Sequence, residues 1–434
     1  MMEALKPYCR QSVVTGTSDG KAPKGIRVHT RAARAPHGLN LYQIGNNWHH
    51  TQELRTALVQ PGLVLLHDLN LLYLYESLAL SDDEMVGLAR RSNLRLSQRT
   101  AERLLNKQPT PKLPYMLASM LPELISRSHR VVVHSRYAKQ FIRAHHGDDA
   151  AQKVDVIPHF AMAADAQDPQ MLRQKLGFDD TDKLIVTAGF ATRAKRFNII
   201  ARAVGELARK DPAIRWIHAG APDHGDFNLQ ELTQAHSSLE GRFHTTGYLD
   251  EQALDDHVAI ADILLNLRFP SVGESSGSLA RALGMGICTL VSDTGSYAEI
   301  PDMAVAKMSA LGGAEELKFV LSHLLNNPAM RRAIGEGAAR YAADELNMGR
   351  YAERLAQSIR QARNHAARKT LTQPFKKLTA WMSPETEVQW IGPLGQETPN
   401  ASLAIVGADA PEDLRYAIDP SPNRPGAYIG ARHP

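Results

Sequence analysis

Apolar strand-like runs alternate with helical runs through the second half of this 434-residue chain, and this alternation constrains its fold more than any other feature. Strands are predicted at 183–188, 214–219, 242–246, 263–267, 287–292 and 304–308. Helices are predicted at 197–208, 228–236, 251–260, from 279 onward and over 314–368. Strands that alternate with helices build a mostly parallel sheet that is covered on both faces. We therefore predict a doubly wound α/β domain.

The first 160 residues carry a less regular form of the same pattern. Strands are predicted at 12–15, 26–29, 40–44, 63–67, 130–134 and 154–157. A helical region at 81–128 is interrupted near 108–111. Such a domain usually opens with a strand, a glycine-rich turn and a helix, but the first forty residues contain no such unit, and 16–21 lacks the spacing of a phosphate loop. We predict a second mostly parallel sheet whose opening strand is missing.

The chain is long enough for two such domains. We predict an N-terminal Rossmann-like domain at 1–160 and a second domain with closing helices at 161–369, joined by a linker near 158–169. The final 65 residues hold nine of the 24 prolines, and helical periodicity ends at Trp381. We interpret 370–434 as a loosely ordered extension or a small added unit of unknown role.

Composition narrows the class of protein. The net charge of +4 suits acidic substrates or a membrane surface, and no zinc-finger or RNA-module signature predicts a nucleic-acid partner. Cys9 and Cys288 show no metal spacing and fit a reducing compartment. The sequence lacks a signal peptide and an apolar run of about 18 residues, so we expect a cytoplasmic protein. Weak binding to the inner membrane face through 376–381 is an alternative, but a solvated helix end is favoured there.

The loop after the strand at 263–267 is the first candidate site. It reads Phe-Pro-Ser-Val-Gly-Glu-Ser-Ser-Gly-Ser over 269–278 and leads into a helix. A helix N-terminus presents unpaired N–H groups and the positive end of a dipole, which suits phosphate. Glycines let the backbone approach a ligand, and the carboxylate of Glu274 can accept hydrogen bonds from ligand hydroxyls. An ordinary capped helix is the alternative interpretation.

A basic segment, 189–196, also lies between a predicted strand and a helix. Its Arg193, Lys195 and Arg196 can neutralise a diphosphate at the carboxyl edge of the sheet, where open α/β sheets bind ligands. Basic residues in the first turn of a helix are also commonly just exposed to solvent. The two segments together favour an anion site, because both follow strands of one domain.

Polar residues follow two strands of the first domain. His67 and Asp68 end the strand at 63–67, and a histidine there can bond a substrate hydroxyl or transfer a proton. A histidine satisfied by backbone groups is the alternative. Gly45, Asn46 and Asn47 follow the strand at 40–44 and line the same edge, unless they serve only as a turn.

Several other kinds of site are excluded by the pattern. The spacing of His49, His50, His134 and His159 with carboxylates does not match a zinc site. The sequence contains no Gly-x-Gly-x-x-Gly after a strand. This absence argues against a dinucleotide-dependent dehydrogenase.

Taken together, these residues resemble glycosyltransferase family 4, whose members have the two-domain GT-B fold. The resemblance is best over 183–345 and weaker over 40–160. It is carried by 183–189 with Lys195, 243–249, 261–265, 291–295 with Glu299, 65–68 and 157–159. The fold that it implies is two doubly wound Rossmann-like domains that face a central cleft, with a C-terminal extension.

The resemblance implies metal-independent, retaining transfer of a sugar from a nucleoside-diphosphate sugar, with no cofactor. It also implies a glycan or lipid-linked acceptor in polysaccharide or cell-envelope biosynthesis. Glu274 would bond the donor sugar's hydroxyls, and His67 would contact the sugar near the reacting centre. The implied donor-binding residues are Gly189, Arg193, Lys195, Arg196, Tyr248, Leu249, Ser275, Ser276, Gly277 and Ser278. The implied acceptor-side or cleft residues are Gly45, Asn46, Asn47 and Asp68.

Two positions depart from the family pattern. The second acid of the family, eight residues after Glu274, falls on Ala282, which puts the ribose contact in question. Position 190, often arginine, is Phe190, so other cations must share the phosphate charge.

An active glycosyltransferase is the leading interpretation of these residues. A non-catalytic sugar-nucleotide or glycan binding module with a degenerate site is the alternative, favoured by Ala282 and the short N-terminus. A GT-B-fold epimerase of sugar nucleotides fits the 269–278 loop less well. Donor hydrolysis or acceptor glycosylation would separate the enzyme from the binding module, and the oligomeric state stays open.

Overall fold

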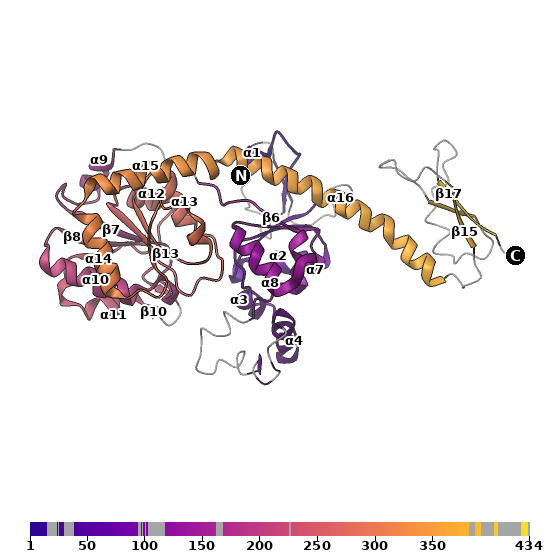
Figure 1. Cartoon of the computed structure of the whole chain (residues 1–434), viewed down its shortest axis with the longest axis horizontal. Helices are drawn as coiled ribbons and strands as arrows, with labels where there is room; N and C mark the ends of the chain where they lie inside the picture. Colours follow the sequence, from indigo (N-terminus) through magenta and orange to yellow (C-terminus); the bar gives the residue numbers. More distant parts are fainter. Residues whose placement is uncertain are drawn as a thin grey trace. The chain divides into compact units, whose positions relative to one another are not determined.

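The structure is a computed structural model that describes residues 1–14, 24, 26–29, 39–93, 97, 99, 101–102, 118–161, 168–224, 227–381, 387–391, 403–406 and 427–432. Two compact units make up the chain, Met1–Ala362 and Arg363–Pro434. The first unit contains two parallel sheets of four and six strands with helices around them (Figure 1). This arrangement confirms the predicted fold class.

The first sheet has the order β3-β4-β5-β6, and every neighbouring pair is parallel. Its strands are β3 (Leu41–Ile44), β4 (Leu63–Leu66), β5 (Arg130–Val133) and β6 (Val154–Val156). Its helices are α2 (Thr51–Val59), α3 (Leu72–Glu76), α4 (Asp82–Ser92), α7 (Pro122–Arg127) and α8 (Arg136–Gln152), with the 3-10 turn η1 (Trp48–His50). Ile44, Val64 and Val131 pack against these helices in one apolar cluster. Because the strand order follows the chain order, this sheet shows one half of the doubly wound pattern.

The other face of the first sheet is covered by elements from both ends of the unit. Leu63, Leu65 and Val132 form a cluster with α1 (Met2–Leu5) and with the start of α16 (Met348–Trp381). Tyr351 and Leu355 of α16 are buried there. The start of α16 therefore completes the first domain, although the sequence grouped it with 161–369.

The second sheet has the order β11-β8-β7-β12-β13-β14 with all pairs parallel. Its strands are β7 (Lys183–Ala188), β8 (Ile214–Ala219), β11 (Phe243–Thr245), β12 (Ile263–Asn266), β13 (Thr289–Asp293) and β14 (Ala306–Ser309). The chain winds from β7 toward β11 and then returns from β12 toward β14. The direction therefore reverses between β7 and β12, and open α/β sheets bind ligands at the carboxyl ends of strands at such a reversal.

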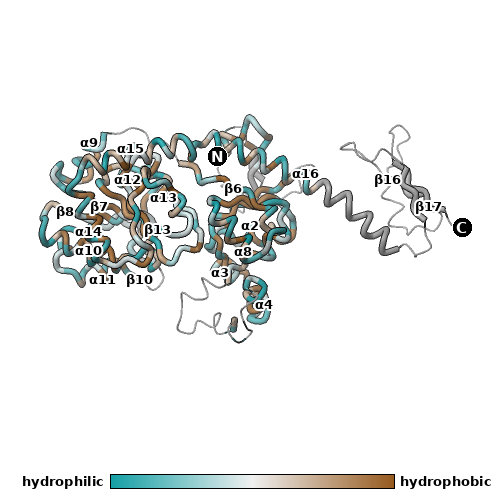
Figure 2. The backbone as a smooth tube through the Cα atoms, in the orientation of Figure 1, coloured by the Kyte–Doolittle hydropathy of each residue, from teal (hydrophilic) through white to brown (hydrophobic). Residues whose placement is uncertain are grey.

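Helices cover both faces of the second sheet (Figure 1). One face packs against α10 (Phe197–Lys210), α11 (Leu229–Gln234) and α14 (Ala314–Leu325) around the buried Trp216. The other packs against α9 (Pro169–Lys175), α12 (Glu251–Ala259) and α13 (Gly277–Gly284). Helix α15 (Pro328–Glu345) lies against α13 and α14. Hydropathy follows this layering, with the apolar strands inside and polar helix faces outside (Figure 2).

Smaller elements complete the described chain. The 3-10 turns are η2 (Arg193–Lys195), η3 (Ser237–Leu239) and η4 (Gly295–Glu299). Strands β1 (Ser12–Val14) and β2 (Arg27–His29) form a parallel pair, and β9 (Asp223–His224) and β10 (Phe227–Asn228) an antiparallel one. The sequence candidates 16–21 and 108–111 lie outside the described residues. None of the described helices is long and apolar enough to cross a bilayer.

The second unit contains a three-stranded sheet that the sequence did not predict. Its order is β15-β17-β16, with β15 (Glu387–Ile391), β16 (Leu403–Val406) and β17 (Ala427–Arg432). Strand β17 pairs antiparallel with β15 and parallel with β16. The extension therefore includes a small added sheet as well as the end of α16.

Candidate functional site

Two loops meet where the second sheet reverses direction. One follows β7 and contains Lys195, and the other follows β12 and contains Arg268 and Glu274. The amide of Phe269 donates to the carbonyl of Ala194 at 2.8 Å, which ties the two loops together. This backbone bond fixes the residue before Phe269 and the residue after Ala194 beside one another.

Lys195 occupies an enclosed position at this junction. Its Nζ donates to the carbonyl of Ala188 at 2.6 Å. Burial, and then the neighbouring Arg268 guanidinium, hold the pKa of Lys195 well below its usual range. Gly189 has φ +78°, and a Cβ there would lie 3.2 Å from Lys195 Nζ. Glycine is therefore required both by the backbone and by the space that the ammonium occupies.

Arg268 was missed as a site residue in the sequence. Its Nε lies 3.1 Å from Glu274 Oε1, and its side chain is 16% exposed. Its amide donates to Ser292 Oγ at 3.0 Å. One signal could have found it: Arg268 follows a buried strand at the same edge of the sheet as Lys195.

Glu274 is held by its own loop as well as by Arg268. Its Oε2 accepts hydrogen bonds from the Val272 amide at 2.8 Å and from Ser271 Oγ at 3.1 Å. The next glycine, Gly273, has φ +85°, and a Cβ there would collide with Leu69 of the first domain. The carboxylate is therefore fixed in a loop that lies directly against the first domain.

The predicted phosphate amides lie at the start of α13, but they differ in their partners. The Ser275 amide donates to the carbonyl of His67 at 3.2 Å. Ser276 caps the helix, since its Oγ accepts from the Leu279 amide at 3.3 Å, and it lies 3.1 Å from Ser278 Oγ. A Cβ at Gly277 would meet open space. The carboxyl end of β4 and the start of α13 thus lie together.

His67 belongs to a group of three histidines from the first domain. Its Nδ1 lies 3.0 Å from His134 Nε2, and His134 Nδ1 lies 2.9 Å from the carbonyl of Ile157. The ring of His159 packs edge-on against His134 at 5.3 Å between centroids. Burial lowers the pKa of His67 to about 4 and that of His134 to about 3. The three rings are therefore neutral near pH 7.

Asp68 lies beside this group. Its Oδ2 accepts from the Asn46 amide at 2.7 Å. Burial raises the pKa of Asp68 to about 6, and the Glu274 carboxylate acts in the same direction. Asn46 Oδ1 accepts from the Leu74 amide at 3.1 Å, and Asn47 Oδ1 accepts from the His49 amide at 3.0 Å. The two asparagines thus organise the turn that Gly45 opens.

Comparison with known proteins identifies the family of the second domain. Residues 168–341 match the model of the family described as glycosyl transferases group 1. The chain therefore carries a group 1 glycosyltransferase domain. It is an enzyme of the family that the sequence resembled, and it transfers a sugar from a nucleotide sugar. A search of curated protein sequences found no match.

Solved structures show the same fold as this glycosyltransferase at low sequence identity. Anabaena HepE in complex with UDP-glucose has a TM-score of 0.54 at 16% identity and covers 74% of this chain and 78% of its own. Sucrose-phosphate synthase from Thermosynechococcus elongatus has a TM-score of 0.51 at 18% identity, and the match covers 74% of this chain and 73% of that one. WaaG, a glycosyltransferase involved in lipopolysaccharide biosynthesis, has a TM-score of 0.52 at 16% identity, and the match covers 82% of this chain and 93% of that one. These likenesses establish the GT-B fold.

Four predicted donor-binding residues of the glycosyltransferase lie around this junction with other partners. Arg196 has φ +62°, and its guanidinium donates to the carbonyls of Ala310 and Gly312. Arg193 lies over the ring of Phe227 at 5.8 Å. Tyr248 is exposed, and Leu249 packs in the core. The role of all four residues as donor contacts stays a prediction. The contacts of Arg196 favour a structural role.

The two positions that depart from the family pattern differ in exposure. Ala282 is buried in the apolar cluster beneath the sheet, so it offers no polar group to a nucleotide. The residue before it, Arg281, pairs with Asp255 of α12. Phe190, by contrast, is 54% exposed at the end of β7.

A hollow of about 620 Å³ lies between the two sheets of the glycosyltransferase. Its lining includes His134 and His159 from the first domain and Glu274 and Ser275 from the second. Glu299 lies at its border, where its carboxylate accepts from the amides of Arg136 and Tyr137 at the start of α8. The hollow therefore opens onto His134, His159 and Glu274.

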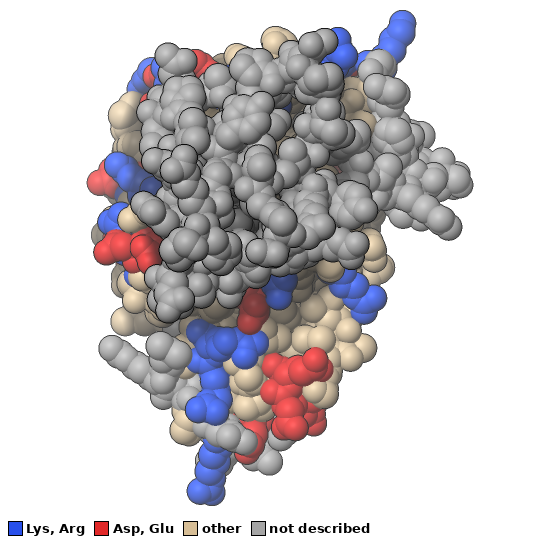
Figure 3. Space-filling model, turned by 90° about the vertical axis from the view of Figure 1, so that its right-hand side faces the viewer, with Lys and Arg blue, Asp and Glu red and all other residues tan. Residues whose placement is uncertain are grey.

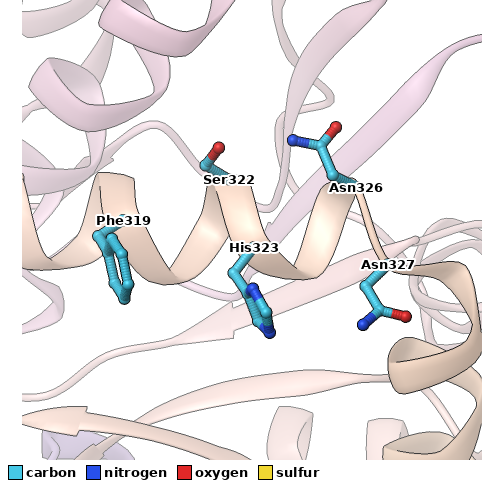
Figure 4. Close-up of a pocket in the computed structure, with 5 residues that line it drawn as sticks. All are labelled: Phe319, Ser322, His323, Asn326 and Asn327. Carbon is cyan, nitrogen blue, oxygen red and sulfur yellow. The ribbon is translucent and has the colours of Figure 1, made fainter.

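A second hollow, of about 370 Å³, lies along α14 and the turn after it (Figure 4). It is lined by Phe319, Ser322, His323, Asn326 and Asn327. Phe319 and His323 point to the same side of the helix. This second hollow shares no lining residue with the hollow between the two sheets. In the described part of the chain, no group of His, Cys, Asp or Glu could hold a metal ion.

Proposed function

We propose that this glycosyltransferase uses a nucleoside-diphosphate sugar and transfers the sugar with retention, without a metal ion, to a glycan or lipid-linked acceptor. The observation that carries the proposal is the pair of cations, Lys195 and Arg268, at the reversal of the second sheet. When the bond between the sugar C1 and the diphosphate oxygen breaks, the nucleoside diphosphate leaves with added negative charge. Fixed cations and N–H dipoles stabilise such charge in an enclosed site.

The reacting sugar would lie between the cation pair and the histidine group. The Ser275 amide bonds the carbonyl of His67, so the sugar-side loop and the end of β4 are in contact. In the tautomer that these contacts favour, His67 presents a proton-free Nε2, which accepts a hydrogen bond from a sugar hydroxyl. Glu274 would act on the same sugar and would also hold Arg268.

The solved structures indicate which donor and acceptor classes to test first. HepE is described in complex with UDP-glucose, which makes UDP-sugars the first candidates for this chain. WaaG is described as acting in lipopolysaccharide biosynthesis, which supports an acceptor of the cell envelope. The described atoms left uncovered in Figure 3 show Lys and Arg next to Asp and Glu. That face offers no support for a nucleic-acid partner.

A panel of UDP-, GDP- and ADP-sugars tests the proposal. Each donor is added without divalent metal to the full chain and to Lys195→Ala, and the melting temperature and the release of free nucleotide are measured. Ligand that binds only the folded protein raises the melting temperature. We expect a rise with one nucleotide class that is lost in Lys195→Ala, together with donor turnover in the native chain. Neither a rise nor turnover with any donor would overturn the proposal.

A further inference from the structure

The diphosphate site of this chain lacks one expected cation. In the family that the sequence resembles, position 190 often carries arginine, but here it is Phe190, 54% exposed. Among the other basic residues of the segment, Arg196 bonds the carbonyls of Ala310 and Gly312, and Arg193 lies over Phe227. Lys195, by contrast, donates to the carbonyl of Ala188 at the end of β7.

Arg268 reaches the same junction from the neighbouring strand. Strands β7 and β12 pair directly, and the Phe269 amide is bonded to the carbonyl of Ala194 at 2.8 Å. Arg268 precedes Phe269 and Lys195 follows Ala194, so this bond brings the two basic residues close together along the backbone. Gly189, with φ +78°, leaves room for the ammonium of Lys195, which a Cβ there would approach to 3.2 Å.

Two neighbouring cations in an enclosed site repel one another. Besides burial, the Arg268 guanidinium is the group that lowers the pKa of Lys195. Glu274 is within 3.1 Å of Arg268, but its second oxygen is held by Val272 and Ser271. A buried charge is stable only with a compensating partner. An anion bound between Lys195 and Arg268 would supply that partner for the lysine.

An ion pair holds the guanidinium beside this loop. Arg268 Nε lies 3.1 Å from Glu274 Oε1, and the carboxylate is anchored at its other oxygen by the loop amide of Val272. A planar guanidinium offers its donors in a rigid fork that matches phosphate oxygens. A guanidinium that is already held by this ion pair loses less conformational entropy when a ligand binds.

We propose that Arg268 is the second phosphate-binding cation of the donor site, in the place that arginine takes at position 190 in related chains, and that Glu274 positions it. This inference rests on the proposed function, because it assigns Arg268 to the diphosphate of the same donor. Arg268 acts on the two phosphates and not on the nucleoside. Its removal therefore changes how strongly the chain prefers a nucleoside diphosphate to the nucleoside alone.

Isothermal titration of the full chain with UDP, UMP and uridine tests this assignment, with the GDP and ADP series run in parallel. We expect Arg268→Gln to weaken UDP binding by about 10- to 100-fold, as charge-assisted hydrogen bonds to phosphate are lost, and to leave uridine binding unchanged. Arg268→Lys retains part of the UDP affinity, because the charge stays and the fork is lost. Adding Phe190→Arg to Arg268→Gln restores UDP binding at least in part.

Arg331→Gln is the matched control. Arg331 is also 16% exposed and paired with a carboxylate, Asp262 at 3.3 Å, but it lies on α15 away from the junction. We expect this variant to keep the native preference for UDP over uridine. The same loss of preference in Arg331→Gln as in Arg268→Gln would overturn the assignment, because it would arise from a broken buried ion pair in general.

The remaining outcomes also decide the question. A folded Arg268→Gln that binds UDP as tightly as the native chain overturns the role of Arg268. Equal loss of UDP and uridine binding also overturns it, because Arg268 would then support the whole pocket. Should Arg268→Gln fail to fold, Arg268→Lys carries the test through the same ratio of UDP to uridine affinity. If the native chain binds none of the three diphosphates, the proposed function itself is refuted. If the native chain binds one of them and the Arg268 variant binds it equally, only the role of Arg268 is refuted.

Discussion

His134 and His67 share a hydrogen bond of 3.0 Å between Nε2 and Nδ1 that links the carboxyl ends of β5 and β4. His134 Nδ1 lies 2.9 Å from the carbonyl of Ile157, which can only accept, so this nitrogen carries the proton. In a neutral ring, His134 Nε2 must then accept, and His67 Nδ1 donates to it. His67 Nε2 is left as an acceptor. It lies 3.4 Å from Gln43 Oε1, which also only accepts, so this tautomer makes no hydrogen bond to Gln43 and leaves Nε2 open to a ligand hydroxyl.

The first prediction concerns this tautomer. His134→Phe keeps a ring between His67 and His159 but removes the acceptor for His67 Nδ1. We expect kcat to fall by roughly 10-fold or more, because His67 no longer holds the tautomer that we propose contacts the sugar. His134→Gln can accept from His67 and donate to Ile157, so we expect it to recover much of the activity. Equal kcat in His134→Phe and the native chain would contradict the argument.

The same histidines predict a pH dependence of stability. The pKa values of about 4 for His67 and about 3 for His134 lie below the usual value of 6.5, because burial disfavours the charged rings, and burial also lowers the pKa of His159. The unfolded chain therefore binds more protons than the folded chain in this range. The stabilisation is full above the unfolded pKa of 6.5 and is lost as the pH falls toward 4.

Thermal unfolding between pH 7.5 and pH 4.5 measures this dependence. Each unit of pKa difference corresponds to about 1.4 kcal/mol of unfolding free energy. We expect the melting temperature of the native chain to fall over this range and that of His134→Gln to fall less steeply, since one buried histidine no longer titrates. Parallel curves for the two proteins would show that His134 does not contribute to the slope.

The sequence identified both strand edges of the site but not the contacts across them. Apolar runs such as 63–66 and 183–188 predicted the strands. His67 and Lys195 follow two of these strands at their carboxyl ends, as the sequence indicated. The bond between His67 and His134 joins residues 67 positions apart, which no local pattern reveals. Arg268 was missed because one arginine after a strand forms no motif. Its position follows only from the pairing of β7 with β12.

The second unit shows a further limit of the sequence. Its strands β15, β16 and β17 pair across gaps of chain rich in proline, and β17 contains a glycine and a single β-branched residue. Local propensity is weak for such strands, because pairing with partners distant in sequence stabilises them. The end of α16 at Trp381, in contrast, was visible as the point where helical periodicity stops.

A third prediction separates the two functions assigned to Glu274. Glu274→Ala removes the proposed sugar contact and the 3.1 Å partner of Arg268, while the loop keeps its glycine conformations. We expect turnover to fall by roughly 100-fold, with the fold intact by circular dichroism. Glu274→Gln keeps an acceptor for the Val272 amide and loses the charge, so it should retain more affinity for UDP than Glu274→Ala. Native turnover in Glu274→Ala would remove this residue from the site.

A fourth prediction concerns Gly273, where the second domain meets the first. Its φ of +85° strains any residue with a Cβ, and that Cβ would collide with the side chain of Leu69. We expect Gly273→Ala to lower the free energy of unfolding by about 1–3 kcal/mol and to weaken donor turnover, because Glu274 is the next residue. Gly277→Ala is the matched control, since a Cβ there meets open space. Equal stability of the two variants in thermal unfolding would contradict the close approach at Gly273.

The last prediction concerns the contact between η4 and α8. The Glu299 carboxylate accepts from the Arg136 amide at 3.0 Å and from the Tyr137 amide, so it caps a helix of the first domain from the second. A carboxylate at this end of a helix satisfies unpaired N–H groups and opposes the helix dipole. We expect Glu299→Ala to lower the free energy of unfolding by about 1–2 kcal/mol.

Glu299→Gln retains one acceptor but no charge, and its stability in thermal unfolding should fall between those of the native chain and Glu299→Ala. If Glu299→Gln matches Glu299→Ala, the charge on the helix dipole carries the contact. If it matches the native chain, the hydrogen bonds alone are sufficient. No loss in either variant would show that the contact does not stabilise the fold.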